Sequence, residues 1–213
     1  MQNEVVSREE WLAARLELLK AEKAHTQARQ ALAEQRKKLP WVRIDKEYLF
    51  AGPDGPVSLV DAFKGRSQLA VYHLMFGPGW DEPCPGCTQW ANALNGTTGT
   101  FGAADARLIA VSRAPIDEIE QQKERLGWSF SWLSSHECDF NYDFHASSEG
   151  GAETGQADGQ SIGFLRGENH GVSVFYRNDA DEVFHTYSAY NRGIEAMNGA
   201  FGYYDLLPKG RAW

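Results

Sequence analysis

The chain of 213 residues is 42% hydrophobic and 12% aromatic, so it can bury one sizeable core without disulfide staples. Its 21 basic residues against 29 acidic ones give a formal net charge of −8, which argues against nucleic acid or an anionic membrane as a partner. No apolar run reaches the roughly eighteen residues that span a bilayer, and no secretory signal pattern is present. We therefore expect a cytoplasmic protein, whose three cysteines do not form a disulfide scaffold.

The N-terminal segment predicts one long helix. Ser7 and Glu10 have the spacing of a capping box, and residues 8–38 contain neither Gly nor Pro before Pro40 ends the helix. The apolar stripe of this helix is narrow and thins out toward its C-terminal half. We interpret residues 1–40 as a helical arm, which either lies along its own domain or embraces a second copy to form a homodimer.

The residues after the arm alternate between strand and helix patterns. The predicted elements are strands over 41–50 and 57–59 joined by a hairpin turn, a buried strand over 67–76, a helix over 88–94, a buried strand over 106–112 and a helix over 115–127. The order strand, helix, strand, helix is typical of a parallel βαβ unit.

The rest of the chain predicts a short strand, an insert and an antiparallel hairpin. The strand covers residues 128–135, and the hairpin strands cover 171–177 and 181–188. Between them, residues 146–168 are rich in Gly, Ser and acids and predict a flexible insert. We interpret residues 41–213 as one domain that carries this insert and closes with helix-like structure.

Two of the three cysteines, Cys84 and Cys87, stand in a C-x-x-C pattern between the first buried strand, 67–76, and the helix that follows it. The free amides and the dipole of a helix N-terminus stabilise a thiolate on the first cysteine, and the second is close enough to form a disulfide with it. Asp81 and Glu82 oppose this effect, because nearby negative charge disfavours a thiolate. The spacing alone is compatible with a redox pair, a metal site or inert packing.

The metal interpretation has four candidate ligands. Cys84 and Cys87, with His136 and Cys138 from a later loop, offer three sulfurs and an imidazole, which zinc accepts tetrahedrally. The carboxyl ends of parallel strands share one edge of a sheet, so this loop is expected to open toward the cysteine pair.

The same edge argument selects the residues that surround the pair. Arg113 follows the second parallel strand, and His170 and Tyr187 stand where the hairpin leaves and returns. Trp80 is close to the cysteines in the sequence and is a candidate for an apolar substrate contact.

Several blocks of the sequence resemble a bacterial family of thioredoxin-like proteins of unknown function, related to the peroxiredoxin and thioredoxin superfamily. The blocks include "VSREEWLAARLELL", "YHLMFGPGWDEPCPGCTQWAN" and "VFHTYSAYNRGIEAMNGAFGYYDLLPKGR". The resemblance implies an α/β thioredoxin-like fold, with a central mixed sheet flanked by helices, and thiol chemistry without a cofactor. Two features depart from related enzymes: no proline lies between Pro115 and Pro208 to stand opposite the cysteines, and Asp81 replaces the hydroxyl residue that peroxidases carry three positions before the reactive cysteine.

The sequence thus predicts a thiol-disulfide oxidoreductase with Cys84 as nucleophile and Cys87 as resolving thiol. Its substrate would be a protein or small-molecule disulfide or thiol. The rival hypothesis is a non-catalytic binding or assembly protein on the same fold, because a fold can persist without its chemistry.

Overall fold

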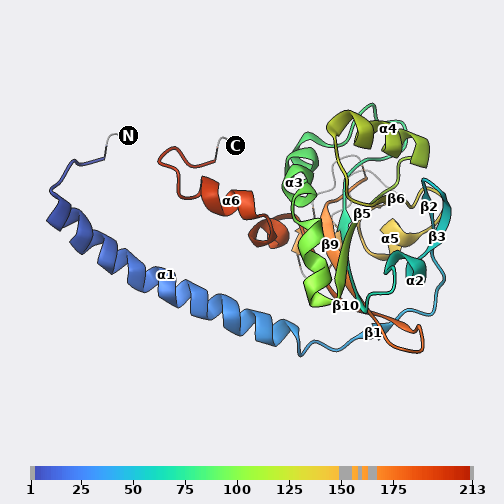
Figure 1. Ribbon diagram of the computed structural model, residues 1–213, viewed down its shortest axis with the longest axis horizontal. Helices are drawn as coiled ribbons and strands as arrows, with labels where there is room; N and C mark the ends of the chain where they lie inside the picture. The colour runs from blue at the N-terminus through green and yellow to red at the C-terminus, as the bar shows by residue number, and fades with distance from the viewer. Residues whose placement is uncertain (1–2, 149–154, 158–159, 163–166, 212–213) are drawn as a thin grey trace. The chain divides into compact units, whose positions relative to one another are not determined.

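The computed structural model describes residues 3–148, 155–157, 160–162 and 167–211. The chain divides into two compact units, Met1–Pro40 and Trp41–Trp213. The first unit holds a single helix, α1 (Arg8–Arg36; Figure 1). The predicted capping box is confirmed, because the Glu10 amide donates to Ser7 Oγ at 3.2 Å and the Ser7 amide donates to Glu10 Oε2 at 2.9 Å. The helix ends two residues earlier than the sequence predicts.

The second unit is built on a mixed sheet in the order β1-β10-β9-β4-β5-β6-β2-β3. Its strands are β1 (Val42–Arg43), β2 (Leu49–Gly52), β3 (Gly55–Ser58), β4 (Gln68–His73), β5 (Ala106–Ser112), β6 (Trp132–Ser134), β9 (Gly171–Arg177) and β10 (Val183–Tyr190). Strands β4, β5 and β6 are parallel at the centre, and all the other pairings are antiparallel. This is the predicted βαβ unit with a hairpin added beside it.

One predicted strand is split between two distant places in the sheet. Residues 41–50 form β1, which pairs with β10, and β2, which pairs with β3 and β6 near the other end of the strand order. The chain between them packs Tyr48 against Phe140 at a ring separation of 5.2 Å. A run that reads as one strand is therefore interrupted by a segment whose Tyr48 packs on Phe140.

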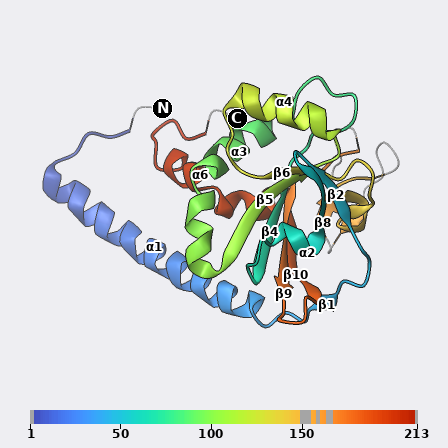
Figure 2. The same cartoon turned by 45° about the vertical axis from the view of Figure 1, so that its right-hand side comes forward.

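Helices cover both faces of the sheet (Figures 1 and 2). They are α2 (Leu59–Ala62), α3 (Pro85–Asn95), η1 (Thr98–Ala104), α4 (Ile116–Leu126), α5 (Phe140–Asp143), η2 (Asn191–Met197) and α6 (Gly199–Tyr204). Side chains alternate between the two faces along β4: Leu69 and Val71 join a core with α2 and α5, whereas Tyr72 joins a core with α3 and α4. We call these the α2/α5 core and the α3/α4 core.

The predicted insert at 146–168 lies partly outside the described residues. Its described central segments form a two-stranded antiparallel sheet, β7 (Gly155–Ala157) with β8 (Gln160–Ile162), where the sequence predicts only a loop. The two ends of the insert are joined, because the Ser148 amide donates to the Gly167 carbonyl at 2.9 Å and the Asn169 amide donates to the Ala146 carbonyl at 2.8 Å. These bonds hold the segment before β9 in a fixed position beside the first residue of that strand.

In the part of the chain that the structure describes, no helix is both long and apolar enough to cross a membrane.

Candidate functional site

The cysteine pair lies at the start of α3, beyond the carboxyl end of β4. Pro85 occupies the first helical position, where its missing N–H costs no hydrogen bond, and Cys84 is the N-cap residue. The Cys84 amide donates to the Met75 carbonyl at 3.0 Å, and the Cys84 carbonyl accepts from the Thr88 amide at 2.9 Å. The backbone therefore fixes Cys84 beside the free amides of the first helical turn.

Cys84 is half-buried, and its pKa is lowered from 9.0 to about 5. The largest cause is a hydrogen bond from the Cys87 thiol, followed among the favourable contacts by the amides of Cys87 and Gly86 and by the charge of His170; burial acts in the opposite direction. The opposing acids that the sequence suggests, Asp81 and Glu82, are not among the causes, and Glu82 pairs with Arg125 at 3.5 Å. Cys84 is therefore a thiolate at neutral pH.

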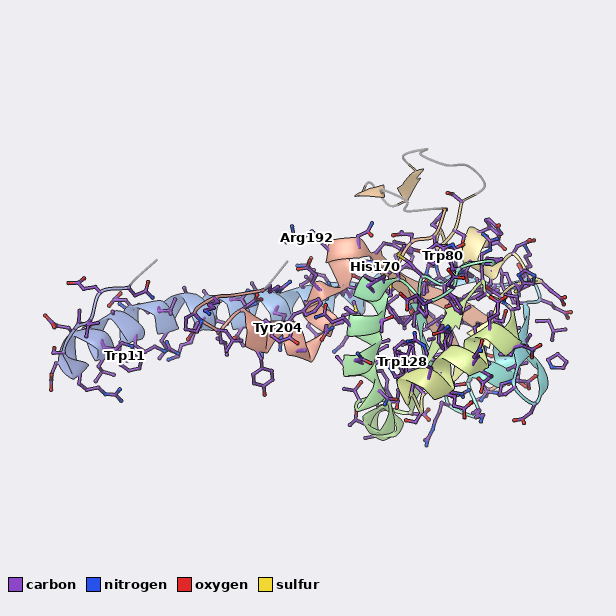
Figure 3. The ribbon with its side chains drawn as sticks, turned by 90° about the horizontal axis from the view of Figure 1, so that it is seen from above. Trp11, Trp80, Trp128, His170, Arg192 and Tyr204 are labelled. Atoms are coloured by element: carbon purple, nitrogen blue, oxygen red, sulfur yellow. The ribbon has the colours of Figure 1, made fainter. Side chains whose placement is uncertain are left out.

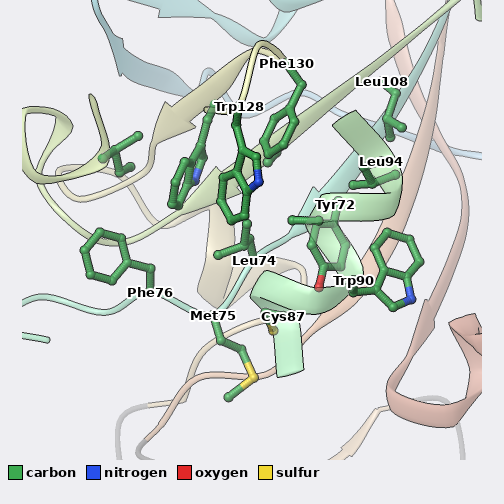
Figure 4. Packing of buried hydrophobic residues seen from close by; sticks show 14 of the residues in the cluster. Tyr72, Leu74, Met75, Phe76, Cys87, Trp90, Leu94, Leu108, Trp128 and Phe130 are labelled. Atoms are coloured by element: carbon green, nitrogen blue, oxygen red, sulfur yellow. The ribbon is translucent and has the colours of Figure 1, made fainter. Parts of the chain in front are cut away.

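Cys87 has the opposite environment, with only 2% of its surface exposed. Its hydrogen bond to Cys84 and its burial both raise the pKa of the Cys87 thiol well above the ordinary value. The buried Tyr72 hydroxyl faces the Cys87 sulfur but has no hydrogen-bond partner of ordinary geometry among the described residues (Figure 4). The Tyr72 ring stacks on Trp90 with the ring centroids 4.3 Å apart. One thiol of the pair is thus ionised and accessible, and the other is protonated and enclosed.

A cleft of about 540 Å³ opens at the pair. Its apolar wall is formed by Met75, Trp90, Ile194 and Phe201, which come from the β4–α3 loop, α3, η2 and α6. The volume falls within the range of roughly 300–1,000 Å³ that is typical of small-molecule sites. The arrangement can therefore hold an organic group next to a reactive thiolate.

Of the additional residues that the sequence selects, the structure places His170 in this cleft. His170 directly precedes β9. Arg192 also lines the cleft, and both residues are labelled in Figure 3. Burial lowers the pKa of His170, while the Asn191 backbone and the nearby charges of Cys84 and Glu195 act to raise it.

Arg113 lies at the expected edge but binds a neighbouring acid rather than lining the cleft. Its guanidinium pairs with Glu168 at 3.1 Å and stacks over the Tyr142 ring at 4.6 Å. Glu168 is 3% exposed and accepts a second hydrogen bond from Ser147 at 2.7 Å. Glu168 lines the cleft and Arg113 does not, so Arg113 acts on the site through its ion pair with Glu168.

Trp80 and Tyr187 lie outside the lining of the cleft. Trp80 packs over Gly77 and borders a separate hollow of about 380 Å³ that also contains Asp81 and Glu82. Tyr187 is half-buried and pairs with Val174 within the β9–β10 hairpin. Strand β10 continues to Tyr190, so the turn toward the cleft comes later than the sequence suggests.

The structure does not bring the four candidate metal ligands together. Among the residues that the structure describes, no group of three or more His, Cys, Asp or Glu side chains could hold a metal ion. Cys87 packs in the α3/α4 core, whereas Cys138 packs against the α2/α5 core on the other face of the sheet. His136 instead bonds through Nδ1 to the Arg113 carbonyl at 3.1 Å. The parallel strand order predicts at which end of the sheet Cys138 lies, but it does not predict on which face of the sheet Cys138 packs.

Sequence reasoning missed most of the polar cleft residues: Gln89, Glu168, Asn169, Asn191, Arg192 and Glu195. Three of them stand in the segment that directly follows the hairpin. Arg192 and Glu195 are three residues apart and form an ion pair at 3.2 Å. The sequence signal that could have found them is the polar and charged segment that directly follows the hairpin, where the chain returns to the end of the sheet that carries the cysteines.

Fold and site define a thioredoxin-like protein with a C-x-x-C pair at a helix N-terminus. The chain belongs to the family described as bacterial protein of unknown function (DUF899), whose profile matches residues 1–213. No curated protein sequence matches it.

Solved structures with a similar fold include two from Xanthomonas campestris. The bacterioferritin comigratory protein, studied for its alkyl peroxide reduction activity, has a TM-score of 0.51 at 16% identity, covering 71% of this chain and 85% of its own. A cysteine-to-serine mutant of peroxiredoxin Q has a TM-score of 0.51 at 17% identity, with the same shares of 71% and 85% covered. At this level of identity the likeness shows the fold.

Proposed function

We propose that the protein is a thiol-disulfide oxidoreductase that uses Cys84 as nucleophile and Cys87 as resolving thiol. The observation that carries the proposal is the asymmetry of the pair: a half-buried thiolate at the mouth of a cleft and a buried, protonated thiol that donates to it. A pair that served only to fill the core would not need an accessible sulfur with its pKa lowered to about 5.

The reaction proceeds by two exchanges. The Cys84 thiolate attacks one sulfur of a substrate disulfide, which forms a mixed disulfide and releases the other half of the substrate as a thiolate. Cys87 then loses its proton to the departing thiolate and attacks Cys84 Sγ. The products are the reduced substrate and an oxidised Cys84–Cys87 disulfide, so the two electrons gained by the substrate come from the two thiols.

The environment of Cys87 changes in the direction that the second exchange requires. Two of the causes that raise the pKa of Cys87, its hydrogen bond to Cys84 and the charge on Cys84, depend on Cys84 being a thiolate. Formation of the mixed disulfide removes that charge. The Cys87 thiol therefore becomes more acidic only after the substrate is attached.

Limiting alkylation and disulfide trapping test these roles. Native reduced protein treated with less than one equivalent of iodoacetamide should carry the label on Cys84. The Cys87→Ser variant should accumulate a stable mixed disulfide at Cys84 with a chromogenic disulfide reagent. Cys138 is the internal control, because burial raises the pKa of its thiol.

The assignment would be refuted by label found mainly on Cys87 or Cys138, or by the absence of any trapped adduct on Cys84. Three thiols that all stay unreactive after mild oxidation would instead support the rival hypothesis of a non-catalytic binding or assembly protein. Reversible loss of two thiols within one chain would support the enzyme.

A further inference from the structure

Two residues that line the cleft beside Cys84 carry buried side-chain donors without partners among the described residues. Asn169 is 3% exposed and Trp90 is 6% exposed, and both line the cleft. Among the described residues, neither Asn169 Nδ2 nor Trp90 Nε1 has a hydrogen-bond partner. Buried polar groups are nearly always paired, and an unpaired donor costs free energy, so two such donors on residues that line one cleft are candidates to bind an acceptor.

The elements that form the cleft hold these donors in place. The Asn169 backbone amide donates to the Ala146 carbonyl at 2.8 Å, which fixes the residue at the base of the insert. Trp90 is fixed by its stacking on Tyr72 at 4.3 Å.

The remaining lining limits the kind of acceptor. Met75, Ile194 and Phe201 supply apolar surface, which suits a carbon skeleton. The Arg192 side chain is 90% exposed and is paired with Glu195 at 3.2 Å, so this ion pair stands at the rim. The Glu168 carboxylate is buried and is held by Arg113 and Ser147. A ligand of this cleft thus combines a compact apolar body with oxygen acceptors.

Resting on the proposed thiol exchange, we propose that the substrate is a low-molecular-weight disulfide whose organic half carries amide or carboxylate oxygens. The cleft holds this half, Asn169 and Trp90 donate to its oxygens, and its sulfur lies at Cys84. The volume of about 540 Å³ accommodates a molecule of the size of a short peptide thiol.

Binding can be measured without thiol exchange. The probe is S-methylglutathione, a tripeptide thioether that offers amide and carboxylate oxygens but cannot form a disulfide. The protein is the full chain with Cys84→Ser and Cys87→Ser, and the assay is isothermal titration calorimetry. We expect saturable binding, weakened about three- to tenfold by Asn169→Leu and by a similar factor by Trp90→Phe, since each removes one donor.

Trp80→Phe is the matched control, because Trp80 lies outside the cleft lining, and it should bind the probe as tightly as the parent. Trp90→Phe keeps an aromatic ring against Tyr72, so it keeps the proposal testable even if Asn169→Leu fails to fold. Absence of saturable binding at millimolar probe, or equal affinity in the parent and both donor variants, would overturn the proposal.

The result separates this proposal from the proposed function. Loss of probe binding with intact trapping of disulfide reagents at Cys84 would overturn the substrate class alone. Donor-dependent binding with no trapping at Cys84 would overturn the oxidoreductase and support the cleft as a binding site for this class of molecule.

Discussion

Replacing Cys87 by alanine should raise the pKa of Cys84, because the thiol of Cys87 is the largest cause of its low value of about 5. A hydrogen bond to a charged group contributes about 1.5–3 kcal/mol, and one pKa unit corresponds to about 1.4 kcal/mol. Cys84 is half-buried, so water replaces part of the lost interaction and the lower end of the range applies. The expected pKa in the variant is about 6. The amides of the helix N-terminus keep it below that of a free thiol.

The assay is the pH dependence of the rate of iodoacetamide alkylation at Cys84, in a Cys138→Ala background so that one reactive thiol remains. The rate rises with pH through the pKa and then becomes constant, because the thiolate is the reactive species. Intrinsic nucleophilicity also rises with pKa, by about threefold for one unit. The two profiles should therefore cross: the variant reacts at about half the parent rate at pH 5 and about three times faster at pH 8.

His170→Gln is the comparison variant, because the His170 charge is the last of the causes that lower the pKa of Cys84. The pKa of Cys84 should rise less in His170→Gln than in Cys87→Ala. Profiles of parent and Cys87→Ala that coincide, or a lower pKa in the variant, would refute the reasoning. The helix amides and not the thiol would then control the ionisation of Cys84.

Three other predictions concern stability, assembly and peroxides. Phe140→Ala should lower the free energy of unfolding in urea by about 3–5 kcal/mol, because the ring is fully buried in the α2/α5 core, whereas Tyr203→Ala, at a side chain 74% exposed, should change it little; equal effects would contradict the packing. The full chain should sediment as a homodimer at micromolar concentration and Leu16→Glu as a monomer, because a unit with one helix cannot bury its own apolar stripe; a monomeric parent would contradict this. Hydrogen peroxide turnover with a dithiol reductant should stay near background, because Asp81 stands where peroxidases carry a hydroxyl, and robust turnover would refute that argument.

The sequence predicted most of the sheet and the position of the cysteine pair because both depend on local signals. Pro85 at the first helical position and the apolar run before it determine where β4 ends and α3 begins. The ends of β5 and β9 match the predicted residues, 106–112 and 171–177, for the same reason. A βαβ order then leaves few topologies to consider.

The residues around the pair were harder to predict because they depend on register and on the face of the sheet. A bulge between His185 and Tyr187 shifts the pairing of β10 with β9, so that Tyr187 lies opposite Val174 within the hairpin and not at its end. Cys138 illustrates the second limit, since its loop leaves from the expected edge but packs on the opposite face from Cys87. Neither effect has a signature in the spacing of the sequence.

The hydrogen bond between the two thiols connects the fold to the order of the proposed chemistry. The pKa of Cys84 is lowered and that of Cys87 is raised by the same contact, so the protein at rest holds one nucleophile and one protected thiol. The α3/α4 core maintains this difference, because burial of Cys87 leaves Cys84 as its hydrogen-bond acceptor. Attack on a substrate removes that acceptor and frees Cys87 to react. Pro85 at the first helical position determines where α3 begins, so the amides of Gly86 and Cys87 add to the hydrogen bond from the Cys87 thiol in lowering the pKa of Cys84.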